Sequence, residues 1–184
     1  MDRFIASDPS AASDRVASEI IELLHAPRPV VLGVAAGATP RVLYRLLVEA
    51  KPPVERLDVV LLDEYLGIGP LAPHSFRRQI CHELTDRLGV SDERVHSPDG
   101  LTDDPVAACR RFEQLIVRLG GVDLQLLGIG RNGHIGFNEP GSSATSRTRV
   151  VDLAPGTRQD NSSAFGSIEL VPTKALTQGL GTIT

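Results

Sequence analysis

The stretch Leu126–Pro140, LLGIGRNGHIGFNEP, holds four glycines among polar side chains and overlaps the end of the apolar run Val122–Leu127. The run predicts a buried strand, and the glycines allow backbone turns that a Cβ atom would forbid. Open α/β sheets bind ligands beyond the carboxyl ends of their strands, which is where His134 and Glu139 would lie. A long surface turn with an exposed histidine is the alternative. The apolar side chains at 135 and 137 would anchor the loop, so a functional site is favoured.

Apolar runs and segments of helical periodicity alternate along the rest of the chain. The runs Pro29–Ala35 and Leu57–Leu62 predict parallel strands that are covered on both faces. Apolar residues spaced three or four apart predict helices. These helices lie near 16–24, with Ser10 or Ser13 as the cap, and at 40–50, 75–88 and 105–119. The order predicts a parallel, three-layer αβα sheet with right-handed crossovers.

Four further segments are less regular. Gly89–Leu101 is polar and predicted to be irregular, whereas the alternation in Ser146–Val151 predicts an edge strand. Ala154–Ile168 is polar and weakly periodic, and we expect a mobile helical flap at 153–170. Lys174–Thr184 predicts the approach to another strand. We expect a single domain over residues 1–184.

Composition narrows the function classes. A length of 184 residues allows one domain with a sizeable core. The net charge of −4 gives no reason to expect nucleic acid or an anionic membrane as partner. The sequence has no apolar run long enough for a membrane span and no apolar signal segment near its start. Cys81 and Cys109 lack metal-ligand spacing, which indicates reduced thiols in a cytoplasmic protein, with a disulfide between them as the alternative.

Two turns follow the predicted strands. After the first, Thr39 suits a helix N-cap and Pro40 the first helical position. A strand, a glycine turn and a helix can aim backbone N–H groups at phosphate, although a plain tight turn fits equally well. After the second, Asp63 and Glu64 begin where the apolar run stops, which suits a general base. The alternatives are a pair of solvated loop carboxylates, or an aspartate that caps the next turn.

Several of these segments together resemble one family. Leu62–Tyr65, Gly128–Pro140 and Ser146–Arg149 resemble glucosamine-6-phosphate deaminases, in the same order and at similar separations, and the similarity continues through Thr157–Arg158 and Val171–Thr177. The resemblance implies a Rossmann-like fold. It also implies conversion of glucosamine 6-phosphate and water to fructose 6-phosphate and ammonia, with no metal or organic cofactor.

The resemblance also implies residue roles. Asp63 would take the proton from C2 of the sugar, and His134 would exchange protons during ring opening, since imidazole titrates near neutrality. Glu139 would hold or charge His134. Asn132 stands where many members carry an acid and others an asparagine. It can orient groups but cannot transfer a proton as a carboxylate does.

Phosphate would bind at Gly37, Ala38 and Thr39 on the helix N-terminus, and Gly130 would contact the substrate. Three departures weaken this part of the pattern. Ala36 and Ala38 replace the threonine and second glycine usual in the family, and the methyl group of Ala38 would hinder close approach of the phosphate. Ser163 stands where the family has an arginine that binds phosphate.

Family members continue past Thr184 with further strands, a helix and a phosphate-binding lysine. We therefore expect a C-terminally truncated chain that lacks its last strands and is poorly stable or inactive. The expected partner is a small-molecule sugar phosphate, with a homo-oligomer as a possible assembly.

Two other functions are compatible with parts of the pattern. A 6-phosphogluconolactonase-like hydrolase would share a Gly-His loop, but the Phe137–Pro140 tail and the Ser-Arg-Thr strand argue against it. A non-catalytic sugar-phosphate-binding or regulatory protein would explain the lost phosphate groups. The retention of Asp63, His134 and Glu139 opposes that reading.

Overall fold

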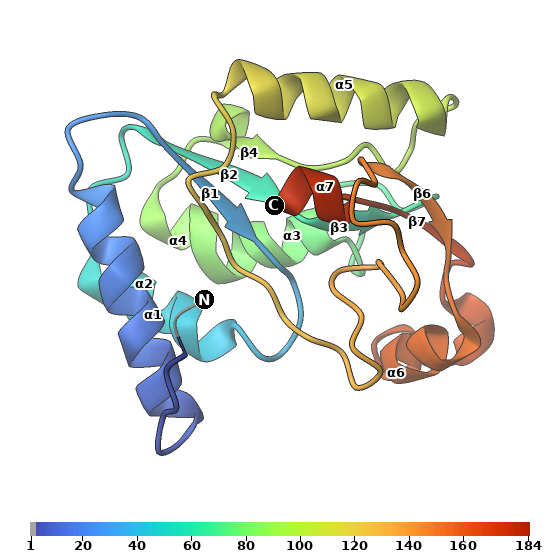
Figure 1. Ribbon diagram of the computed structural model, residues 1–184, viewed down its shortest axis with the longest axis horizontal. Helices are drawn as coiled ribbons and strands as arrows, with labels where there is room; N and C mark the ends of the chain where they lie inside the picture. Colours follow the sequence, from blue (N-terminus) through green and yellow to red (C-terminus); the bar gives the residue numbers. More distant parts are fainter. Residues whose placement is uncertain (1–2) are drawn as a thin grey trace.

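The computed structural model describes residues 3–184, and its centre is a parallel sheet of four strands (Figure 1). The strands are β4 (Val95–His96), β2 (Leu57–Leu61), β1 (Val30–Val34) and β5 (Leu124–Gln125), in that spatial order. β1 pairs in parallel with both β2 and β5. The predicted α/β fold with a mostly parallel sheet is confirmed.

Helices cover both faces of this sheet, and the side chains of β1 and β2 divide between them. One face packs against α1 (Pro9–Leu24) and α2 (Arg41–Ala50), and the other packs against α5 (Pro105–Arg118). The first face contains Val30, Leu32, Val34, Leu57, Val59 and Leu61, and the second contains Val31 and Val60. Figure 1 shows α5 on one side of the sheet and α1 and α2 on the other, which gives three layers.

A second, antiparallel sheet adjoins the first and is not part of the sequence prediction. Its order is β3 (Asp63–Tyr65), β7 (Lys174–Thr177) and β6 (Arg149–Asp152), so β6 is the edge strand that the sequence predicts. Only Leu62 separates β2 from β3. The chain therefore passes from one sheet to the other at the carboxyl end of β2, and Asp63 stands at this junction.

The remaining elements follow the predicted order. The helix expected over 75–88 is present as α3 (Phe76–Ile80), a π-helical turn η1 (Cys81–Thr85) and α4 (Asp86–Leu88), with Ser75 as its cap. The segment after β6 forms α6 (Pro155–Phe165), so a helix is confirmed there, and a 3-10 turn η3 (Ile168–Leu170) follows it.

Two predicted helix starts are wrong. Asp8, not Ser10 or Ser13, caps α1, because its carboxylate accepts the Ala11 N–H at 2.9 Å and Pro9 already occupies the first turn. α2 begins at Arg41 with Pro40 as its cap, and no side chain bonds there. The Arg41 N–H bonds the Ala38 carbonyl at 3.3 Å, so a separate turn precedes the helix and Thr39 is not its cap.

Three further predictions are wrong about where strands lie. The Val122–Leu127 run is a strand only at Leu124–Gln125, and it is half-buried because β5 lies at the sheet edge. Gly89–Leu101 is not irregular throughout, since it contains η2 (Asp92–Arg94) and β4, held by pairing with β2.

The segment Lys174–Thr184 begins as a strand but ends as a helix. β7 is the central strand of the second sheet, but α7 (Leu180–Ile183) follows it in place of a further strand. The chain turns at Gly179, and the Leu180 N–H bonds the Ser146 hydroxyl at 3.0 Å.

Within residues 3–184, no helix combines the length and apolar character that crossing a membrane requires. Cys81 and Cys109 both carry free thiols.

Candidate active site

The glycine-rich loop 126–140 is fixed to the second sheet by two buried side chains. The ring of Phe137 lies 5.7 Å from that of Tyr65 and 6.1 Å from that of Phe76, measured between centroids. The Asn138 amide donates to the Gln178 carbonyl at 2.8 Å. The loop is thus anchored at Phe137, as the sequence predicts, whereas Ile135 is only half-buried.

Asp63 is the first residue of β3 and is only 7% exposed. Its carboxylate makes no hydrogen bond to any other residue in the described part of the chain. Burial, and secondarily the negative charge of Glu64, raise the pKa of Asp63 from its ordinary value to about 8. A buried carboxyl group with such a pKa, facing a cavity, is typical of a proton-transfer residue.

Glu64 has a different role, because its carboxylate caps α3. It accepts the Ser75 hydroxyl at 2.7 Å and the backbone N–H groups of Phe76 and Arg77 at 3.2 and 3.1 Å. A carboxylate at a helix N-terminus is stabilised by these groups and by the helix dipole. Of the two acids at this junction, one therefore holds a helix and only Asp63 is free to meet a ligand.

His134 is connected to Glu139 through Asn132. The His134 Nδ1 lies 2.8 Å from the Asn132 Oδ1, and the Asn132 Nδ2 donates to the Glu139 carboxylate at 2.7 Å. Asn132 thus stands between the two residues, where the sequence interpretation expects Glu139 itself to hold the imidazole.

This arrangement determines which ring nitrogen carries the proton when the imidazole is neutral. An ionised carboxylate only accepts hydrogen bonds, so the amide of Asn132 must turn its N–H₂ toward Glu139 and its oxygen toward His134. The Nδ1 of a neutral His134 must then carry the proton, and its Nε2 keeps a free lone pair. His134 is in this way prepared to accept a proton at Nε2.

Thr157 on α6 completes the network, and the sequence interpretation gave it no role. Its hydroxyl donates to the other oxygen of Glu139 at 2.6 Å. This bond, followed by the Asn132 bond and the positive charge of protonated His134, keeps the pKa of Glu139 below its ordinary value. The glycine-rich loop 126–140 and α6 are therefore joined by a hydrogen bond to an ionised carboxylate.

We expect the substitution Thr157→Val to lower kcat/KM by roughly 3- to 10-fold, because one charge-assisted hydrogen bond to Glu139 is lost. The pKa of Glu139 should rise, so the loss should grow at the acid end of the pH profile. Steady-state kinetics between pH 5 and 8 would measure this. Ser162→Ala, an exposed hydroxyl on the same helix, is the control and should behave like the parent. Equal kinetics for both variants would contradict the role of Thr157.

Asp63 and His134 line the same cavity, although Asp63 follows β2 and His134 follows β5. The cavity has a volume of about 240 Å³, and Phe76, Phe137 and Asn161 also line it. Gly130 lies against the His134 ring, since a Cβ atom there would be 2.2 Å from the ring atoms Cε1 and Nε2. The structure thus brings together the two residues on which the sequence interpretation most depends, and places Gly130 beside them.

The predicted phosphate turn borders two hollows. Gly37 and Ala38 line a second cavity of about 710 Å³, which adjoins the first because Phe76 and Asn161 line both. Gly37 has φ +112°, a conformation that favours glycine. Thr39 does not line this cavity, but together with Gly37 and Ala38 it lines an apolar hollow between α1 and α2.

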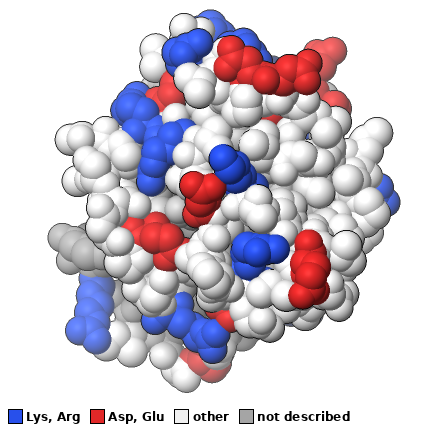
Figure 2. All heavy atoms as spheres, turned by 90° about the vertical axis from the view of Figure 1, so that its right-hand side faces the viewer, with Lys and Arg blue, Asp and Glu red and all other residues white. Residues whose placement is uncertain are grey.

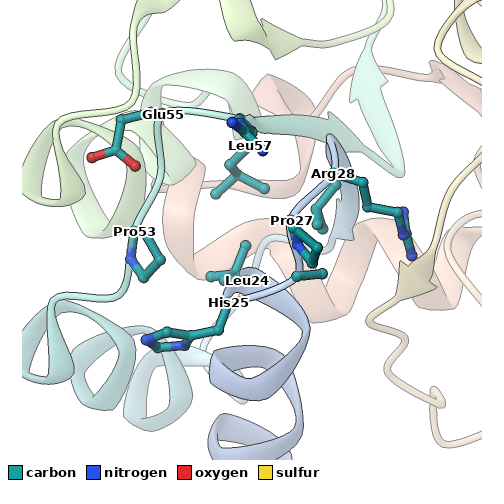
Figure 3. Close-up of a pocket in the computed structure, with 10 residues that line it drawn as sticks. Leu24, His25, Pro27, Arg28, Pro53, Glu55 and Leu57 are labelled. Carbon is teal, nitrogen blue, oxygen red and sulfur yellow. The ribbon is translucent and has the colours of Figure 1, made fainter.

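Another hollow, of about 410 Å³, lies at the opposite end of the sheet (Figure 3). Leu24, Pro53 and Leu57 line it, and Figure 3 shows the guanidinium group of Arg28 extending away from Glu55 and His25. Arg28 pairs instead with Asp123 at 2.7 Å. None of the predicted site residues lies there, so the candidate site is the pair of cavities at the carboxyl end of the strands.

Charges of both signs are interspersed on the face of the molecule that carries α6 and β6 (Figure 2). One exposed pair joins the site to this face, because Arg131 of the glycine-rich loop bonds Asp160 of α6 at 2.5 Å. The loop and α6 are thus linked by this ion pair as well as by the Thr157 hydroxyl.

A model of the family described as glucosamine-6-phosphate isomerases/6-phosphogluconolactonase matches residues 7–160. The chain belongs to this family. A glucosamine-6-phosphate deaminase of Arthrobacter sp. (strain FB24) is 48% identical and matches 91% of this chain and 66% of its own length. The deaminase of Cutibacterium acnes is 45% identical over 100% of this chain and 72% of its own length.

Solved structures separate the two branches of the family. A structure described as a monomeric glucosamine-6-phosphate deaminase has a TM-score of 0.96 and 41% identity, and covers 100% of this chain and 78% of that one. A 6-phosphogluconolactonase of Thermotoga maritima has a TM-score of 0.71 at 20% identity, which shows the shared fold alone. The relatives with high identity are thus deaminases.

Proposed function

We propose that this chain carries the active site of a glucosamine-6-phosphate deaminase, which converts glucosamine 6-phosphate and water to fructose 6-phosphate and ammonia. The observation that carries the proposal is the convergence of Asp63 and His134 on one cavity. The identity of 40 to 48% with curated deaminases supports the same reaction.

Ring opening is assigned to His134. Its Nε2 accepts the proton of the anomeric hydroxyl, and the resulting imidazolium can return that proton to the ring oxygen as the C1–O bond breaks. The Asn132–Glu139 pair stabilises the imidazolium, because a carboxylate lies one side chain away. Glu139 is ionised for this purpose, since its hydrogen bonds lower its pKa.

The isomerisation is assigned to Asp63. Its ionised carboxylate removes the proton from C2, which gives an enolamine, and returns the proton to C1. A protonated amino group on C2 favours the ionised form of Asp63, because an opposite charge close to a carboxylate lowers its pKa. Water then adds to the C2 imine and ammonia leaves, so C2 becomes the ketone of fructose 6-phosphate.

The phosphate group belongs in the larger cavity beside Gly37 and Ala38, where remote binding holds the reacting carbons near Asp63. We include α6 as a flap over the site, since Thr157 and Asp160 bond the glycine-rich loop. A cytoplasmic location belongs to the same proposal. A homo-oligomer stays a prediction from the sequence, and the solved deaminase relative is described as monomeric.

The direct test compares two substrates. The protein should release ammonia from glucosamine 6-phosphate and should not hydrolyse 6-phosphogluconolactone above the spontaneous rate. Lactone hydrolysis without ammonia release would assign the chain to the other branch of the family. Binding of fructose 6-phosphate without turnover of either substrate would identify a non-catalytic sugar-phosphate-binding protein.

A further inference from the structure

The larger cavity carries positive charge on the wall formed by α2 and α3. Arg41 at the start of α2 and Arg78 on α3 both line it, near Gly37 and Ala38. Two histidines, His74 and His82, also line the cavity. A phosphate monoester needs cationic or N–H donors, so this wall is the part of the cavity with matching chemistry.

Acidic residues in the same cavity are already paired. Glu83 bonds Arg41 at 3.0 Å, and Asp160 bonds Arg131 at 2.5 Å. Arg78 differs, because no carboxylate in residues 3–184 lies within ion-pair distance of it and its Nη1 donates only to the Leu71 carbonyl, at 2.5 Å. Arg78 is therefore the arginine in this cavity whose charge no carboxylate of residues 3–184 neutralises.

The wall formed by α6 has no cation of its own at the expected place. Ser163 lines this cavity from α6, at the position where the family resemblance implies an arginine. The two arginines on the opposite wall face the same space. The cavity therefore retains positive charge, but α2 and α3 supply this charge in place of α6.

Building on the proposed function, we propose that Arg78, assisted by Arg41, binds the phosphate group of the substrate in place of a cation on α6. The six-carbon sugar reaches from Asp63 and His134 past Asn161, which lines both cavities, and its phosphate group lies between Arg78 and the Gly37–Ala38 turn. Arg78 donates through its free N–H groups, and Gln79 bonds both Glu83 oxygens, which fixes the partner of Arg41.

The test uses Arg78→Gln and Arg41→Gln. We expect Arg78→Gln to raise KM for glucosamine 6-phosphate about 10-fold, because a hydrogen-bonded charge pair is lost, and to change kcat less than threefold. Arg41→Gln should have a smaller effect in the same direction. With glucosamine, which lacks phosphate, both variants should react as fast as the parent. A merely structural role would impair both substrates alike.

Arg45→Gln is a matched control. Arg45 lies on α2, pairs with Glu49, and its side chain is 59% exposed, as is that of Arg41, but it does not line the cavity. Binding of fructose 6-phosphate measured by calorimetry separates this inference from the proposed function. If the parent protein releases no ammonia, this result contradicts the deaminase proposal but not the assignment of Arg78 to phosphate binding. Fructose 6-phosphate bound as tightly by Arg78→Gln as by Arg45→Gln would overturn the assignment of Arg78.

Discussion

The substitution Asp63→Asn should lower kcat/KM for glucosamine 6-phosphate by about 100- to 10,000-fold, since an amide cannot remove the proton from C2. In the parent, kcat/KM should rise with pH, because the free enzyme needs the ionised carboxylate and the pKa of Asp63 is about 8. The rise of kcat/KM with pH should be absent in Asp63→Asn. Stopped assays of ammonia release from pH 6 to 9 would measure both effects.

The same substitution should change how stability depends on pH. The pKa of folded Asp63 is about 8 and its ordinary value is 3.8, so the folded state binds more protons than the unfolded state between these pH values. The stabilisation from protonated Asp63 is complete below about pH 4 and is lost as pH rises through 8. Asp63→Asn should therefore be more stable than the parent at pH 9, on the order of a few kcal/mol.

Thermal unfolding at pH 5 and pH 9 would provide the control for misfolding. An inactive variant that unfolds early at both pH values would say nothing about catalysis and would count against a stabilising change at this site. A variant with parent-like kcat/KM would remove Asp63 from the mechanism.

The substitution Gly130→Ala should lower kcat/KM by about 100-fold through a displacement of His134. The added methyl group would lie 2.2 Å from the ring, so the imidazole must move away, and a displacement of about 1 Å in a catalytic group costs a factor of this size. Stability should change little, because the ring borders a cavity into which it can move. Kinetics together with thermal unfolding would measure both quantities.

Gly156→Ala is the matched control. Gly156 lies in α6, has no neighbouring heavy atom within 4 Å of an added Cβ, and does not have a positive φ. It should keep the kinetics of the parent. If Gly130→Ala is equally active, then the packing of the glycine against the ring does not position the imidazole.

Much of the fold could be predicted because burial imposes a pattern on the sequence. β1 and β2 are covered on both faces and read as continuous apolar runs, and the apolar face of α5 gives helical spacing. β4 and α7 escaped prediction because they have two and four residues and depend on contacts far along the chain, with β2 and Ser146. Sequence periodicity carries no signal for such contacts.

The sequence predicts which residues line the candidate cavity better than it predicts the hydrogen bonds that those residues make. Asp63 and His134 follow strands, and the topology then decides that they meet. The role of Glu64 depends on the position of Ser75, which is 11 residues away, and that of Asn132 depends on which way its amide turns. Residue type alone predicts neither role, because the same side chains also suit a general base or a solvated loop.

Four of the seven aromatic side chains of the protein, Tyr65, Phe76, Phe137 and Phe165, pack together beneath the site. The protein has no tryptophan and only one other tyrosine, Tyr44. In a Tyr44→Phe variant, Tyr65 is the single tyrosine and dominates the intrinsic fluorescence, and it contacts Phe165 of α6 with a centroid separation of 5.3 Å. The emission of this one ring therefore offers an unlabelled optical signal for any movement of α6 when sugar phosphate binds.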